Sequence, residues 1–274
     1  MEAASRLLNT LLPLLYALTV AAYAADFFRE DAFARRAARR LMELTLFFHV
    51  AHLGLRTALY DHVPLASLAE VATTVAFAVA FVYIVVERRS GSTRTGLFVV
   101  SFSLVAQTLS SAFLETGHVS FPPILKSPLF AIHTVAAVIG YAAFALSAVY
   151  GVLYLLLHHE LKRSRFGLVY QRLPPLEVLA RMSLGAVLVG VAALTVTIVC
   201  GSLWASSEFP GFTHDPKFLM TLGVWLVYGL AIALHWGRGW SGRRTITMSL
   251  VAFGFLIFSM VAAKVLFESF HVFA

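Results

Sequence analysis

The sequence predicts an all-α membrane protein, a bundle of about eight transmembrane helices with both chain termini outside. Of its 274 residues, 59% are hydrophobic and 13% are charged, against about 25% charged in soluble domains. The hydrophobic residues gather into runs long enough to cross about 30 Å of hydrocarbon, which takes roughly 20 residues. Basic residues cluster between alternate runs. The whole chain, 1–274, is therefore expected to be one transmembrane domain.

Eight apolar runs account for the predicted spans. The fifth and eighth exceed what a span requires, so we expect them to tilt or to project beyond the bilayer. Small residues end the first run in a pattern similar to a signal-peptide cleavage site. Because five arginines follow it, an uncleaved span is the preferred interpretation. The runs are 7–25, 41–59, 65–86, 96–114, 128–157, 177–200, 217–236 and 245–270.

Lysine and arginine predict the orientation of these spans. The loops 26–40, 87–95, 158–176 and 237–244 hold 15 of the 21 basic residues, and the loops between them are nearly free of basic charge. The positive-inside rule puts the basic loops on the inner side, and the termini and the stretch 201–216 on the outer side. Topology thus explains the net charge of +7, and no nucleic acid partner is expected.

The stretch 200–228 is polar, aromatic and glycine-bearing, and it lies between two apolar runs. Irregular backbone is not tolerated in lipid, so this stretch must lie at a membrane surface or line a cavity. Its aromatic side chains offer flat apolar faces beside polar groups, which favours a large planar cofactor. The candidate ligand-binding residues are Trp204, Phe212, His214, Asp215 and Trp225.

Two histidines are predicted to emerge at the same outer level as this stretch. His133 lies near the start of the fifth run, and His271 ends the eighth. Neutral imidazole is a good ligand for haem iron. Taken singly, each histidine is better explained by helix packing or a solvated chain end. Their convergence with an aromatic stretch favours iron bound between them.

Three further histidines lie deeper in the predicted bundle. His49 and His52 are three residues apart and share one helix face, and His235 ends the seventh run. Ionisable side chains within spans are costly and usually functional. A second haem within the bilayer and an internal hydrogen-bond network are about equally good interpretations.

These residues resemble the haem-handling membrane proteins of cytochrome c assembly, of the CcsA, CcmC and HemX type. The resemblance is greatest over residues 128–274. It rests on His133 and the residues after it, on the Phe270–His271 pair, and on Gly201, Trp204, Asp215, Pro216, Lys217 and the Trp225-Leu226-Val227-Tyr228 stretch. Because Phe212 and His214 stand where the family has tryptophan, the chain is most similar to the HemX-like branch.

The resemblance implies a haem-binding role in a bacterial plasma membrane. His133 and His271 would ligate the iron of haem b, and His235 with either His49 or His52 would form a pair within the membrane. The protein would present haem at the outer face, or modulate haem supply, together with a haem-accepting or haem-synthesis partner protein. It is not expected to catalyse a reaction alone. The alternatives are an integral b-type cytochrome that carries electrons, and a non-haem transporter or structural membrane subunit.

Overall fold

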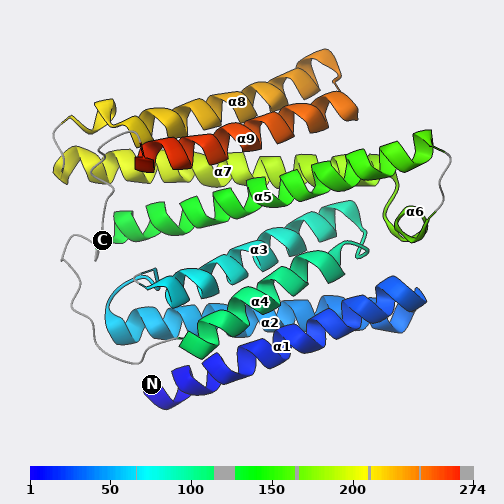
Figure 1. Cartoon of the computed structure of the whole chain (residues 1–274). Coiled ribbons are helices and arrows are strands. Elements are labelled where there is room, and N and C mark those ends of the chain that lie inside the picture. The colour runs from blue at the N-terminus through cyan, green and yellow to red at the C-terminus, as the bar shows by residue number, and fades with distance from the viewer. Residues whose placement is uncertain (66, 114–126, 164–166, 209–210, 241, 266–274) are drawn as a thin grey trace. The chain divides into compact units, whose positions relative to one another are not determined.

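Long helices make up nearly all of the protein. The computed structural model describes residues 1–65, 67–113, 127–163, 167–208, 211–240 and 242–265, and no strand occurs within these ranges. A short 3-10 turn, Phe212–His214, precedes the eighth helix. The helices are α1 Glu2–Arg29, α2 Ala32–Tyr60, α3 Leu68–Ser90, α4 Gly96–Phe113, α5 Pro128–Lys162, α6 Leu168–Arg172, α7 Leu176–Glu208, α8 Pro216–Arg238 and α9 Arg243–Val265 (Figure 1).

Each of the eight predicted spans overlaps one long helix, which confirms the all-α, multi-pass prediction. Six helices, namely α1, α3, α4, α5, α7 and α8, are long and apolar enough to cross a membrane. The described part of α9 and the whole of α2 do not meet that criterion. In α2 the reason is visible in the sequence, since even the stretch that follows its four arginines holds Glu43, His49, His52 and Arg56. Eight spans and the outer position of both termini stay predictions.

Contacts divide the chain into two compact units. Unit 1 comprises residues 1–127 and 159–178, and unit 2 comprises residues 128–158 and 179–274. Helices α5 and α7 each contribute to both units. The expectation of a single transmembrane domain stays a prediction.

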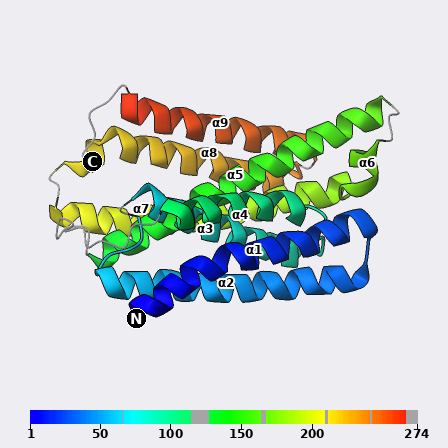
Figure 2. The same ribbon diagram turned by 60° about the horizontal axis from the view of Figure 1, so that its bottom comes forward.

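Unit 1 is built on helices α1 to α4. Helix α1 packs against α2 and α4, and α3 packs against α4 (Figure 1 and Figure 2). Tyr16, Tyr23 and Tyr83 are fully buried among them, and a large share of the remaining core is polar. The turn between α1 and α2 is set by Asp31, whose side chain accepts hydrogen bonds from the backbone N–H groups of Phe33 and Ala34, as an N-cap residue does.

Unit 2 has an apolar core to which α5, α7, α8 and α9 all contribute. At its centre the rings of Phe144 and Tyr228 stack, with centroids 3.9 Å apart and planes 9° from parallel. Helix α7 comes close to Phe144 because residue 190 is glycine. A Cβ atom there would lie 2.5 Å from Phe144 Cε1. This packing fixes the helices that surround the candidate site.

One sequence expectation about unit 2 is corrected. The stretch 201–216 was expected to be a loop, but α7 continues through residue 208, so Trp204 is helical. Hydropathy falls after Cys200, whereas helix formation does not depend on hydropathy. The hydroxyls of Ser206 and Ser207 bond back to the carbonyls of Leu203 and Trp204, and this part of the sequence holds no proline to end the helix.

Candidate functional site

Unit 2 contains a pocket of about 270 Å³ between α5, α7 and the start of α8. Its walls are mostly apolar and aromatic, with one imidazole and one ammonium group. This composition is typical of a cofactor site, in which apolar walls hold the ligand and a few polar groups orient it. The wall includes Phe130, His133, Thr197, Gly201, Trp204, Phe212, Lys217 and Phe218.

His133 is held on α5 by a hydrogen bond to α7. Its Nδ1 lies 2.8 Å from the backbone carbonyl oxygen of Thr197. A carbonyl oxygen can only accept, so Nδ1 carries the hydrogen. The neutral ring therefore has its lone pair on Nε2. Metal-ligating histidines show the same arrangement, in which one ring nitrogen donates to a backbone carbonyl and the other binds the metal.

Gly201 makes room for this histidine. A Cβ atom at residue 201 would lie 2.4 Å from His133 Nδ1 and 2.7 Å from Cε1. Any larger residue would push the ring away from α7 and from the Thr197 carbonyl. Gly201 thus has a steric role that its place in a motif did not reveal.

Two pairs of aromatic rings stand in the pocket wall. Trp204 is buried and its ring centroid lies 5.1 Å from that of Phe130. Phe212 and Phe218 meet edge to face with centroids 5.5 Å apart. The structure therefore brings the predicted residues His133, Trp204 and Phe212 to one pocket.

Three of the predicted residues do not line this pocket, namely Trp225, His214 and Asp215. Trp225 lies on α8, and its Nε1–H donates to Thr195 Oγ1 over 2.9 Å. His214 is exposed in the 3-10 turn, with its Nδ1 3.3 Å from Thr213 Oγ1. His271 lies outside the described residues.

Asp215 starts the helix that brings Lys217 to the pocket. Its Oδ1 accepts hydrogen bonds from the backbone N–H groups of Lys217 and Phe218, at 2.9 and 3.1 Å. Asp215 is thus the N-cap of α8, followed by Pro216 at the first helical position, a favoured start. The structure gives Asp215 this role in positioning the site.

Replacing Asp215 by alanine is expected to lower the free energy of unfolding by about 1 kcal/mol, the usual cost of losing an N-cap. Thermal unfolding in detergent, followed by circular dichroism, measures the change. Asp215→Asn is the matched control, because an amide oxygen can still accept from the helix. Equal stability of the alanine and asparagine variants would contradict the capping role.

The sequence reasoning missed Phe130, Thr197 and Phe218. A helical spacing of three to four residues would have found the α5 wall, since Phe130 and His133 lie on one helix face. Nothing in the sequence indicates the Thr197 carbonyl, because every residue has one. Its role depends on the register between α5 and α7.

His49 lies in the core of unit 1 with both ring nitrogens engaged. Nδ1 lies 2.9 Å from the Tyr16 hydroxyl, and Nε2 lies 2.9 Å from Thr73 Oγ1. Thr73 donates its own hydrogen to Gln107 Oε1, so it accepts from His49 Nε2–H. Nδ1 then accepts from Tyr16. In the structure, His49 is therefore part of an internal hydrogen-bond network.

His52 and His235 differ from His49. His52 is fully buried in unit 1, and neither of its ring nitrogens has a hydrogen-bond partner among the described residues. His235 lies in unit 2, with Nδ1 2.5 Å from the carbonyl oxygen of Trp240. By the same reasoning as for His133, the neutral ring of His235 has its lone pair on Nε2.

The fold and the pocket define a class, the multi-pass helical membrane proteins with an aromatic, histidine-bearing pocket. Within that class, the chain belongs to the cytochrome c assembly protein family, whose model matches residues 89–271. The matched region includes every residue of the pocket. This confirms the resemblance found in the sequence.

Individual relatives agree with the family. Protein HemX of Bacillus subtilis (strain 168) is 27% identical over 218 residues, which cover 78% of each chain. The cytochrome c biogenesis protein CcsA of Synechococcus sp. (strain CC9605) is 27% identical over 245 residues, again 78% of each. Protein HemX of Brevibacillus brevis is 32% identical over 127 residues, covering 46% of this chain and 47% of that protein.

Proposed function

We propose that the protein binds haem b in the pocket of unit 2 and presents it at the outer face of a bacterial plasma membrane, or modulates haem supply. The single observation behind the proposal is the tautomer of His133. A histidine with Nδ1–H held by a carbonyl, in an aromatic pocket, is prepared to bind metal through Nε2. Membership of the cytochrome c assembly family supports haem as the group and a maturation machinery as the setting.

The pocket residues fit a haem. Haem supplies an iron centre that takes axial imidazole ligands, and His133 Nε2 would be one of them. Trp204, Phe130 and Phe212 would contact the porphyrin through their apolar faces. The ammonium group of Lys217 would attract a propionate. The sequence holds a single cysteine, so it lacks the CxxCH pattern of covalent haem attachment.

His271 is the proposed second axial ligand. It follows α9 in sequence and is placed outside by the positive-inside rule, as is the start of α5. The proposed partners are a haem-accepting or haem-synthesis protein and the surrounding membrane lipid. Neither presenting haem nor modulating its supply requires the chain to catalyse a reaction by itself.

The test is haem uptake by the purified protein, followed by its optical spectrum and a pyridine haemochrome assay. Loss of a group that hydrogen-bonds to a metal ligand typically costs about 10–100-fold in affinity. Removing the ligand itself, in His133→Ala, is therefore expected to weaken haem uptake by more than about 100-fold. His271→Ala is expected to change the spectrum by removing one axial imidazole. His214→Ala, at an exposed residue outside the pocket wall, is the control and should bind normally. A wild-type protein that takes up no added haem would refute the proposal.

A second candidate function is an integral b-type cytochrome, and the ring of His52 favours it. A fully buried imidazole without a partner is costly, and ligation of an iron would satisfy it. His49 would not ligate the iron, because both of its ring nitrogens are engaged. This function predicts a reversible redox spectrum that His52→Ala abolishes and His271→Ala leaves unchanged. No haem at all, with normal folding of every histidine variant, would favour a non-haem transporter or structural subunit.

A further inference from the structure

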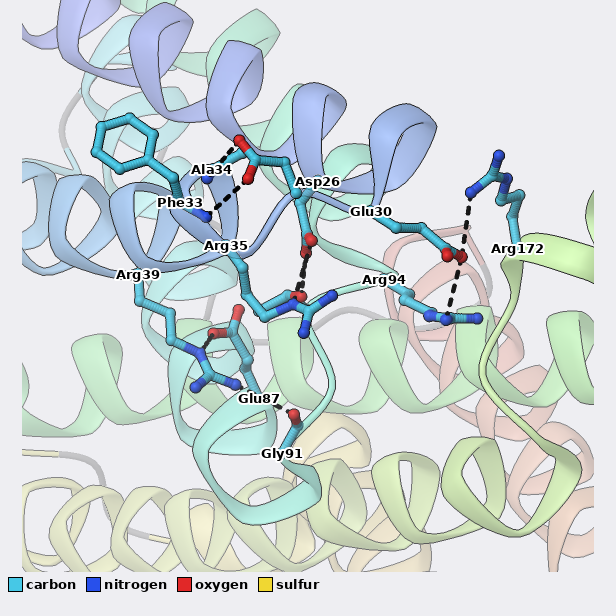
Figure 3. Close-up of polar contacts among 12 residues, drawn as sticks. Asp26, Glu30, Phe33, Ala34, Arg35, Arg39, Glu87, Gly91, Arg94 and Arg172 are labelled. Carbon is cyan, nitrogen blue, oxygen red and sulfur yellow. Dashed lines mark hydrogen bonds and ion pairs between the residues drawn. The ribbon is translucent and has the colours of Figure 1, made fainter.

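Four arginines in the first turns of α2 divide into two pairs. Arg35 and Arg39 are four residues apart and share one helix face, and Arg36 and Arg40 share the neighbouring face. Figure 3 shows the first pair directed at buried carboxylates of unit 1. Arg35 Nε lies 3.1 Å from Asp26 Oδ1, and Arg39 Nε lies 3.0 Å from Glu87 Oε1. The charge of this pair is balanced within the protein.

The charge of the second pair is not balanced in this way. Arg36 and Arg40 are exposed, and in the described part of the chain neither forms an ion pair. Glu43, the acidic residue nearest to Arg40 in sequence, pairs with Arg88 at 2.5 Å. Asp31, the nearest to Arg36, accepts hydrogen bonds from the backbone at the start of α2. Glu30 pairs with Arg94 and Arg172 (Figure 3). Two positive charges therefore remain on one face of α2.

This face carries a groove that combines charge with apolar surface. The groove has a volume of about 280 Å³ and is lined by Phe33, Arg36, Ala37, Arg40, Leu41 and Leu44 of α2. Phe33 is 71% exposed and Leu44 is 43% exposed. These apolar side chains lie beside the two guanidinium groups in one groove. The groove suits a ligand that is itself anionic at one end and apolar at the other.

The position of the groove along α2 indicates the same ligand. The predicted span begins at residue 41, so Arg36 and Arg40 are expected at the inner boundary of the membrane and Leu44 within the hydrocarbon. Guanidinium groups bind phosphate oxygens through paired hydrogen bonds. The inner leaflet carries anionic lipids, which attract each nearby arginine by about 1 kcal/mol.

We propose that this face of α2 binds one anionic glycerophospholipid of the inner leaflet. Arg36 and Arg40 contact its phosphate, and Leu41 and Leu44 contact an acyl chain. The site is separate from the haem pocket, and the proposal does not depend on haem binding.

Native mass spectrometry tests the site by measuring which lipid stays bound to the protein. The protein is released from nanodiscs that contain both phosphatidylcholine and phosphatidylglycerol. The wild type is expected to retain one phosphatidylglycerol more tightly than phosphatidylcholine. The double variant Arg36→Gln/Arg40→Gln is expected to bind that lipid about 30-fold more weakly, the factor that corresponds to about 1 kcal/mol for each arginine. Haem uptake should be unchanged, which separates this proposal from the one above.

Lys162→Gln/Arg163→Gln is the charge-matched control. These residues are exposed, are predicted to lie on the same inner side and do not line the groove, so lipid retention should match the wild type. An equal loss in both double variants would overturn the proposal in favour of net charge alone. Displacement of the lipid by millimolar inorganic phosphate would also overturn it, in favour of a free anion. Equal retention of the two lipids would show that no headgroup site exists.

Discussion

Gly201→Ala is expected to weaken haem binding by about 10–100-fold, the range seen when the partner that orients a metal-ligating histidine is disturbed. The added Cβ would fall 2.4 Å from His133 Nδ1, so the imidazole must move. The imidazole would then lose its hydrogen bond to the Thr197 carbonyl oxygen, which keeps the hydrogen on Nδ1. Optical titration of the purified variant with haem measures the effect.

Gly229→Ala is the matched control for this change. Gly229 lies on α8 in the same unit, and a Cβ there would meet no atom within 4 Å. We expect this variant to bind haem as the wild type does. If Gly201→Ala also binds normally, while His133→Ala does not, the steric role assigned to Gly201 is wrong.

Glu70→Ala is expected to destabilise the protein by about 3–5 kcal/mol, the cost of removing one partner of a buried ion pair. Arg56 Nη2 lies 2.7 Å from Glu70 Oε1, and the two side chains are 6% and 5% exposed. The guanidinium also lies over the ring of Tyr60, 4.7 Å from its centroid. Thermal or denaturant unfolding in detergent measures the loss.

Two further variants test whether the unpaired charge is the cause. Arg56→Met/Glu70→Met removes both charges, and we expect it to be more stable than Glu70→Ala, since a buried pair can be replaced by apolar residues at little cost. Glu2→Ala removes a pair with Arg6 that is 67% exposed on both sides. It should change stability by less than about 1 kcal/mol. A double variant as unstable as Glu70→Ala would contradict the explanation.

Local sequence predicted much of the candidate site. His133, Trp204 and Phe212 do line one pocket, because the histidine begins one helix and the aromatic residues end and follow another at the same level. Trp225 and His214 were expected beside them because they belong to the same aromatic and polar stretch of the sequence. They lie elsewhere because residue type does not tell which face of a helix, or which side of a turn, a side chain occupies.

The inner histidines show the same limit. Sequence reasoning treated His49 and His52 alike, since both lie on one face of one apolar run. In the structure His49 is hydrogen-bonded by Tyr16 and Thr73 from two other helices, and His52 has no hydrogen-bond partner within the described ranges. The difference arises from the register of neighbouring helices.

The sequence by itself determined that the protein is helical and multi-pass, which family it belongs to, and which residue types are available to bind haem. These follow from composition, run length and short motifs, which are local properties of the chain. Only the tertiary structure decided that α7 extends to residue 208, that Gly201 and the Thr197 carbonyl hold His133, and that Arg35 and Arg39 are neutralised while Arg36 and Arg40 are not. Each of these depends on distances between residues far apart in sequence, and such distances are set by helix packing.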